Sequence, residues 1–343
     1  TISTIGNVVI SEDTGLQIVT FSGVTTGGET ETLTITATSS DPTIVPNPSV
    51  TYTSPQVSGS LSFTPVPNAN GTVTITVTVR DPGLDTIAGN GDDGITNTAF
   101  TVTVTPVNDV PSFTVGANQT VNEDSGLQTV SAWASGISAG PPNESSQILT
   151  FNVVGNTNPT LFASPPSISP TGVLTYTPAL NANGSATISI TLSDNGGGTN
   201  TTGVQTFQIT VNPVNDAPSF VAGANQSVAE DSGPQNVSNW ATSISAGPAD
   251  EASQTLTFNI SGNSNPSLFS VPPTVQANGT LSYTPAPNAN GSATITLNVS
   301  DSGGTANGGV NASGSQTFTI TVNAVNDPPT FVVGANQTVL EDA

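Results

Sequence analysis

Acidic side chains are the main groups in this sequence that could do chemistry. The 343 residues include 23 Asp and Glu against one basic residue, Arg80, which gives a formal charge of −22. There is no His and no Cys, and since Arg80 is the one basic residue there is no Lys. The chain therefore lacks a general base poised near neutral pH, a thiol nucleophile, a Schiff-base amine and the usual zinc ligands. We predict that it is not an enzyme.

The same charge imbalance bears on possible partners. A chain without basic patches has no electrostatic footprint for nucleic acid, and it is repelled by anionic membrane surfaces. No stretch reaches the roughly 18 apolar residues that a membrane span needs. We therefore expect neither nucleic acid as a partner nor a membrane span in this segment.

The acids recur at fixed spacing along the chain. Glu-Asp pairs begin at residues 12, 123, 230 and 341, separated by 111, 107 and 111 residues. Asn-Asp-x-Pro motifs begin at residues 108, 215 and 326, and Asn-Ala-Asn-Gly begins at 68, 181 and 288. A period of this size matches one small autonomous domain rather than a solenoid turn. We predict repeats at 1–107, 108–214 and 215–325, with the start of a fourth at 326–343.

The elements that must position these acids have the pattern of β-strands. Residues 72–79, 186–192 and 294–299 alternate Val, Ile, Leu or Ala with Thr, Ser or Asn, which is typical of strands with one buried face. Clusters of Gly, Pro, Asn and Ser separate about seven such segments in each unit, and no helical stripe is found. The sequence predicts an all-β fold of tandem Ig-like, Greek-key β-sandwiches in an elongated array.

Strand ends and linkers meet at the poles of a sandwich, and the acids are concentrated there. Asp109 and Asp216 lie in linkers, while Asp194 and Asp301 end the long alternating strand. Several carboxylates without basic partners repel one another, and a hard cation removes the repulsion. Calcium takes six to eight oxygen ligands from carboxylates, amide side chains and carbonyls. We therefore expect Ca²⁺ at the junctions between units.

The motifs also resemble those of cadherins. Val-Asn-Asp-Ala-Pro-Ser-Phe is similar to the cadherin linker Asp-x-Asn-Asp-x-Pro-x-Phe, and each Glu-Asp pair resembles the cadherin Glu that follows the first strand. Ser-Asp-Asn-Gly-Gly resembles the late Asp-x-Gly loop, and Asp250-Glu251 the early Asp-x-Asp loop. Over the whole chain the units resemble the cadherin-like, Ig-like repeats of large bacterial surface proteins. That resemblance implies adhesion, matrix or stalk roles and calcium shared between neighbouring units.

The resemblance also implies a set of metal ligands at each junction. For the junction of the first two units the set is Glu12, Asn108, Asp109, Glu144 and Asp194. For the junction of the second and third units it is Glu123, Asn215, Asp216, Asp250, Glu251 and Asp301. At the last junction it is Glu230, Asn326 and Asp327. The linker lacks the first Asp of the cadherin motif, and the cadherin Leu-Asp-Arg-Glu motif is absent. We therefore expect fewer and weaker calcium ions per junction than in cadherins.

A purely structural interpretation of the same residues stays open. Asn-Asp-x-Pro can form an Asx turn that a rigid proline fixes, and Ser-Asp-x-Gly can be a plain hairpin turn. In the first unit, Asp81, Asp85, Asp92 and Asp93 are spaced by glycines and could either wrap an ion or form an acidic hairpin loop.

We predict a stiff, acidic, extracellular rod with a structural or adhesive role, such as a bacterial surface stalk or a biofilm matrix component. One alternative is a self-assembling filament, in which the strand-like residues 330–343 pair with a sheet edge of another copy. A further alternative is a carbohydrate-binding array that uses Trp133 and Trp240, although two tryptophans at equivalent positions are more typical of a core. The expected partners are calcium ions and other copies or surface and matrix components.

Overall fold

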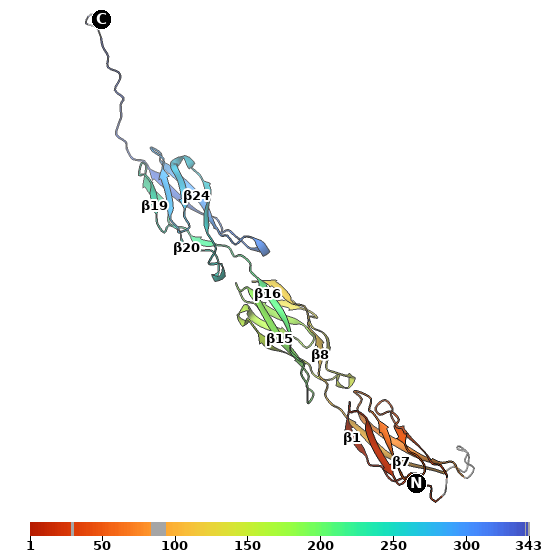
Figure 1. Cartoon of the computed structure of the whole chain (residues 1–343). Helices are drawn as coiled ribbons and strands as arrows, with labels where there is room; N and C mark the ends of the chain where they lie inside the picture. The colour runs from red at the N-terminus through yellow and green to blue at the C-terminus, as the bar shows by residue number, and fades with distance from the viewer. Residues whose placement is uncertain (29–30, 84–93, 340, 342–343) are drawn as a thin grey trace.

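The computed structural model shows three β-sandwich units placed end to end in an elongated array (Figure 1). It describes residues 1–28, 31–83, 94–339 and 341. Asp85, Asp92 and Asp93, which could form an ion-binding loop, lie outside the described residues. The prediction of an all-β, tandem Ig-like fold is confirmed.

Unit 1 folds from strands of alternating burial into two sheets, with strand orders β1-β7-β6-β3 and β2-β5-β4. In β6 the valines and isoleucine face the core while the threonines between them face outward, as the alternation predicts. Its strands are β1 (Val8–Ser11), β2 (Gln17–Ser22), β3 (Thr34–Ser39), β4 (Ser49–Thr51), β5 (Ser58–Phe63), β6 (Gly71–Asp81) and β7 (Gly94–Thr105).

Unit 2 has the same two sheets, ordered β12-β15-β16-β9 and β10-β14-β13, and a short β11-β8 pair. Its strands are β8 (Ser112–Thr114), β9 (Gln119–Asn122), β10 (Gln128–Val130), β11 (Ser135–Ser138), β12 (Thr150–Asn156), β13 (Phe162–Ile168), β14 (Leu174–Pro178), β15 (Gly184–Ser193) and β16 (Gln205–Asn212). Two 3-10 turns, η1 (Pro142–Glu144) and η2 (Pro159–Leu161), complete it.

Unit 3 repeats unit 2, with sheets ordered β18-β25-β24-β21 and β19-β23-β22 and the pair β17-β20. Its strands are β17 (Ser219–Val221), β18 (Gln226–Ala229), β19 (Gln235–Val237), β20 (Thr242–Ser245), β21 (Thr257–Asn263), β22 (Phe269–Val275), β23 (Leu281–Pro285), β24 (Gly291–Ser300) and β25 (Gln316–Asn323). Its 3-10 turns are η3 (Ala249–Glu251), η4 (Pro266–Leu268) and η5 (Ala306–Gly308).

The strand pattern of unit 3 is richer than the sequence indicated. Where about seven strands were expected there are nine, β17 to β25. The sequence does not indicate strand β22, because Pro272 and Pro273 argue against a strand. Since β22 is an edge strand, its prolines need not donate a ladder hydrogen bond on the open side, and they protect that edge from pairing.

Each unit encloses its own apolar core between its sheets. Trp133 and Trp240 are 5 % and 3 % exposed, and each packs against a phenylalanine of the last strand at 4.3 Å between ring centroids. Each indole N–H donates to a backbone carbonyl, of Ala117 at 2.9 Å and of Ala224 at 3.0 Å. The core role expected for the tryptophans is confirmed, and neither ring offers a surface for sugar.

Among the described residues, no helix is long and apolar enough to cross a membrane. After β25 the chain continues as an extended segment without strand pairing (Figure 1). Phe331 and Val332, which are 86 % and 96 % exposed, lie in this segment.

Candidate functional site: the junctions between units

A parallel pairing brings the predicted acids to the linkers. In every unit a short early strand, β1, β9 or β18, runs parallel to the last strand of that unit, so both end at the same pole. Glu12 follows β1 directly and is 2 % exposed. Its Oε1 accepts the backbone N–H of Val107 at 2.7 Å, just after β7. An antiparallel pairing would have put these two residues at opposite poles.

The same buried glutamate recurs at the end of units 2 and 3. Glu123 accepts the N–H of Val214 at 2.6 Å, and Glu230 accepts the N–H of Val325 at 2.7 Å. Both glutamates are buried. A charged acceptor on a linker amide fixes the direction in which the chain leaves the sandwich.

We call the contact region of units 1 and 2 junction 1–2, and that of units 2 and 3 junction 2–3.

A second buried glutamate holds the linker from the following unit. Glu144 lies on η1 and accepts the N–H of Asp109 at 2.9 Å. Glu251 on η3 does the same for Asp216 at 2.8 Å. Each linker aspartate is thus anchored by its backbone to the unit that follows it.

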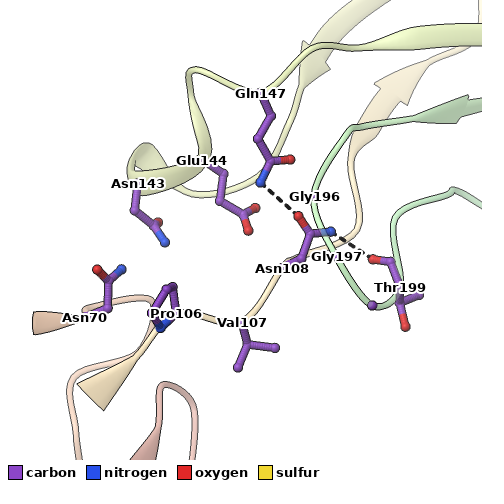
Figure 2. Close-up of a pocket in the computed structure, with 11 residues that line it drawn as sticks. Asn70, Pro106, Val107, Asn108, Asn143, Glu144, Gln147, Gly196, Gly197 and Thr199 are labelled. Atoms are coloured by element: carbon purple, nitrogen blue, oxygen red, sulfur yellow. Dashed lines mark hydrogen bonds between the residues drawn. The ribbon is translucent and has the colours of Figure 1, made fainter. Parts of the chain in front are cut away.

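The linker asparagine is wedged among groups of the following unit (Figure 2). The Oδ1 of Asn108 accepts from Gln147 Nε2 at 2.8 Å, and its amide donates to the carbonyl of Thr199 at 3.1 Å. Asn215 makes the matching contacts with Gln254 at 2.8 Å and with the carbonyl of Val310 at 2.8 Å.

The late aspartate of each unit completes the junction. Asp194 and Asp301 each accept the N–H of the glycine two residues on, at 2.8 and 2.9 Å, in an Asx turn. Asp301 also accepts the amide of Asn215 at 3.1 Å. A Cβ on Gly303 would lie 1.6 Å from Asn215 Oδ1, so only glycine fits there.

Several buried carboxylate oxygens at the junctions have no hydrogen-bond partner. They are Asp109 Oδ2, Glu144 Oε2, Glu230 Oε2, Glu251 Oε2 and Asp301 Oδ2. A buried charged oxygen without a partner is costly, and structures rarely leave one so. The equivalent residues Glu144 and Glu251 both have such an oxygen, so junctions 1–2 and 2–3 each hold a polar group that calls for a donor or a cation.

Electrostatic repulsion acts on the same groups. Desolvation by burial raises the pKa of Asp109 above its ordinary value, and the nearby Asp13 and Glu12 raise it further. Desolvation also raises the pKa of Asp216, with Asp124 and Asp250 adding to the effect. The pKa of Glu251 is raised mainly by desolvation, against the lowering effect of the Asp216 N–H. Each shift means that the folded junction disfavours the negative charge.

Side-chain amides of the third residue of the Asn-Ala-Asn-Gly turn take part in the site as hydrogen-bond donors. The amide of Asn183 donates to Asp250 Oδ2 across junction 2–3 at 2.9 Å and to Glu123 Oε2 at 3.4 Å. Asn70 makes the equivalent bond to Glu12 at 3.4 Å. The turn recurs in every unit, beginning at residues 68, 181 and 288, and this recurrence could have shown that it belongs to the junction.

An open cavity lies at each junction. The cavity at junction 1–2 has a volume of about 690 Å³, and Asn70, Asn143 and Glu144 are among the side chains that line it (Figure 2). The cavity at junction 2–3 is smaller, about 340 Å³, with Asn183, Asp250 and Glu251 in its lining.

The predicted ligands come together only in part. Glu12 stands beside the linker, and Glu144 and Asp194 meet Asn108 and Asp109 from unit 2. Within the described ranges, however, no three acidic side chains are grouped closely enough to hold one metal ion. Side-chain amides donate to some of these carboxylates, Asn108 to Asp194 and Asn70 to Glu12.

At the last junction the predicted set is not assembled. Glu230 is buried, while Asn326 and Asp327 are exposed in the extended segment after β25. The Asn326 amide donates to the carbonyl of its neighbour Asp327. At junctions 1–2 and 2–3, η1 or η3 of the following unit binds the linker, and the described chain holds no such turn after residue 327.

The fold defines the class of protein: a tandem array of Ig-like β-sandwiches. Residues 215–323 match the family described as Bacterial Ig domain, which covers unit 3. Unit 3 is thus similar to this family, and units 1 and 2 have the same two-sheet fold. No curated protein matches the chain.

Two solved cadherin ectodomains are similar to this chain at low identity and low TM-score. Mouse protocadherin-24 EC1-3 is 13 % identical, covering 94 % of this chain and 98 % of its own, with a TM-score of 0.40. Mouse cadherin-23 EC22-24 is 16 % identical, covering 94 % and 96 %, with a TM-score of 0.45. At such low scores the likeness says nothing about what this chain binds.

Proposed function

We propose that the chain is part of an extracellular rod with a structural or adhesive role, in which repeats 1–107, 108–214 and 215–325 act as spacers. The support is architectural. Three units, each with its own core, follow one another along one axis (Figure 1). The recurring glutamates and linker aspartates lie at the junctions.

We further propose that calcium ions stiffen the junctions. The observation that carries this is the set of buried, unpartnered carboxylate oxygens, above all Glu251 Oε2 with Asp301 Oδ2 and Glu144 Oε2 with Asp109 Oδ2. With 23 acids and one basic residue in the chain, the protein has no cations of its own to supply at every junction. The donor set consists of carboxylate, amide and carbonyl oxygens, which is the chemistry that Ca²⁺ prefers.

Residues of both neighbouring units would hold the ion. At junction 2–3 these are Glu123 from unit 2, the linker residues Asn215 and Asp216, and Asp250, Glu251 and Asp301 from unit 3. A bound divalent ion would neutralise the repulsion that raises the pKa of Asp216 and Glu251. The linker asparagine would turn its carbonyl oxygen toward the site, since its amide nitrogen now faces Asp301.

Thermal unfolding of the 343-residue chain in millimolar calcium and in chelator tests the proposal. Calcium that binds only the folded junctions should raise the melting temperature by several degrees, because saturation at about 100 times Kd stabilises by roughly 2.7 kcal/mol. The double variant Glu251→Gln, Asp301→Asn should lose a large part of this shift.

Asp41→Asn is a matched control for this experiment. The Asp41 carboxylate accepts the N–H and hydroxyl of Thr43 within its own turn, so its removal should leave the calcium-induced shift unchanged. An equal melting temperature in calcium and chelator for the unmodified chain would overturn calcium stiffening. The acids would then act as solubilising turn residues.

The exposed segment after β25 favours one second candidate, a filament in which residues 330–339 pair with another copy. Phe331 and Val332 are almost fully exposed there. In unit 1, however, the edge of β7 that would accept such a strand is already paired with β1, from Val8↔Val102 to Ser11↔Thr105. Strand donation would have to displace β1. Electron microscopy distinguishes the two functions, because a filament lengthens with concentration and a rod does not.

A further inference from the structure

The loop between the last two strands differs in length between units 2 and 3. In unit 2 it is closed by the isolated bridge Ser193↔Thr201, and in unit 3 by Ser300↔Ala312, so the unit 3 loop is four residues longer. This insertion accounts for the difference between the 107-residue and 111-residue spacings. In Figure 1 the longer loop, drawn in blue, extends from unit 3 on the side that faces unit 2.

The added residues form η5, and this turn touches unit 2. Asn307 has a φ of 58°, and its amide donates to the carbonyl of Pro213 at 3.3 Å. Its own carbonyl accepts the amide of Asn122, at the end of β9, at 3.4 Å. One residue of unit 3 therefore contacts both strand ends that form the pole of unit 2.

The linker residue Asn215 also binds this loop through two hydrogen bonds. The N–H of Val310 donates to the carbonyl of Asn215 at 2.8 Å, and the Asn215 amide donates back to the carbonyl of Val310 at 2.8 Å. Gly309 allows this approach, since a Cβ there would lie 3.0 Å from the Asn215 nitrogen and 3.1 Å from its oxygen. The Asn183–Asp250 bond at 2.9 Å adds a third contact between the bodies of the two units.

Junction 1–2 lacks these contacts. Ser11 occupies the place of Asn122, and Asn143 occupies the place of Asp250. The short loop of unit 2 offers the linker asparagine the Asp194 carboxylate and the Thr199 carbonyl, but it holds no residue equivalent to Asn307. Between the described parts of 1–107 and 108–214, we find no hydrogen bond that joins the two units. The larger cavity at this junction, about 690 Å³ against about 340 Å³, agrees with a looser interface.

We propose that residues 301–313 form an interdomain clasp that holds units 2 and 3 in one orientation without a metal ion. The array then has one junction with a preformed orientation and one, junction 1–2, whose orientation depends on a bound cation. The second half of this statement rests on the proposed calcium function, and the first half does not. The interaction surface of the clasp consists of Asn307 on unit 3 and Asn122 with Pro213 on unit 2.

Distances between spin labels on the whole chain test the clasp. The chain has no Cys, so pairs of single cysteines can be introduced at exposed, equivalent positions: Ile18→Cys with Thr129→Cys, and Thr129→Cys with Asn236→Cys. In chelator, the 129/236 distance distribution should be clearly narrower than the 18/129 distribution. Calcium should narrow the distribution of distances between labels at 18 and 129, and it should change the distribution between 129 and 236 little.

The variant Asn122→Ser, Asn307→Gly removes both amides of the clasp. Serine is the residue found at the equivalent place in unit 1, and glycine adopts the positive φ of residue 307 freely. If each hydrogen bond favours the closed orientation roughly two- to tenfold in population, the 129/236 distribution in chelator should broaden to that of 18/129. Asn239→Gly, at another exposed asparagine with a φ of 54°, is the control and should leave it unchanged.

Equal widths of the two distributions in chelator would overturn the clasp, and so would a 129/236 distribution that the double variant does not broaden. Failure of the calcium proposal gives a different result. In that case calcium narrows neither distribution, while the contrast between the two junctions in chelator persists.

Discussion

Junctions 1–2 and 2–3 share one set of buried anchors and differ in what reaches across the interface. In both, a glutamate of the preceding unit accepts a linker N–H, and a glutamate of the following unit accepts the N–H of the linker aspartate. Only in junction 2–3 do Asn183 and Asn307 join the bodies of the units, as far as the described residues show.

The comparison separates two tasks. The anchors act within a unit or between a unit and its adjoining linker, so they set the path of the chain at every junction alike. The bridging contacts come from a loop insertion and from single replacements at exposed positions, and these can vary without disturbing the core. An array built in this way can have junctions of different stiffness on one scaffold.

The largest effect is expected from removing an anchor. Glu12→Ala and Glu123→Ala each leave a linker N–H without its charged acceptor, at a cost of about 2 kcal/mol. Hydrogen exchange of the Val107 and Val214 amides should accelerate by roughly 30-fold in the respective variants. Glu→Gln at the same positions keeps an acceptor and should cost less. Very unequal effects at the two junctions would show that the anchors are not equivalent.

Exchanging the one carboxylate that differs between the junctions should sharpen the contrast. Asn143→Asp gives junction 1–2 the acid of junction 2–3, and Asp250→Asn does the reverse. We expect calcium affinity, measured by titration calorimetry, to rise by roughly tenfold for the first variant and to fall comparably for the second, because ligand charge tunes oxygen sites. Unchanged affinities would place residues 143 and 250 outside any calcium site.

A smaller effect is expected from pH in the presence of chelator. The folded chain holds the protons of Asp109, Asp216 and Glu251 more tightly than the unfolded chain, since their pKa values are raised above the ordinary 3.8 and 4.5. These ionised carboxylates therefore destabilise the folded chain at neutral pH, and the destabilisation is relieved as the pH falls through their raised pKa values.

The melting temperature in chelator should accordingly rise as the pH falls from neutral toward the ordinary carboxyl range. Junction 2–3 should gain more than junction 1–2, because two raised carboxyls lie there against one. Asp41 acts in the opposite sense at lower pH, since its pKa is lowered by its hydrogen bonds to Thr43. With calcium present the trend should reverse, because protonation competes with the ion. A fall in melting temperature on acidification in chelator would contradict the assignment of these shifts.

Much of the fold could be predicted from local pattern. The alternation in residues 72–79 predicts β6 with its outward threonines, and the tryptophans were correctly placed in the cores. Strand β22 could not be predicted, because its prolines are tolerated only by virtue of its place at a sheet edge. The repeat boundaries and the calcium ligands remain predictions.

The candidate site was predictable in composition but not in geometry. The recurrence of Glu12 and Asp109 in equivalent positions marked the poles correctly. The sequence did not show that the early strand is parallel to the last one, and this pairing is what places Glu12 on the linker. Nor did it show that Asn183 and Asn307 supply amide donors at junction 2–3.

By itself the sequence determined the period, the alternating strands and the excess of acids, since these depend only on residue type and spacing. The tertiary structure decided which acids are buried, which of their oxygens lack a partner and which junction is bridged. Those properties depend on the parallel pairing of the early and last strands, and on the contact between the loop of residues 301–313 and unit 2. Such contacts join residues far apart in the chain, up to the 185 positions between Asn122 and Asn307, where no local pattern operates.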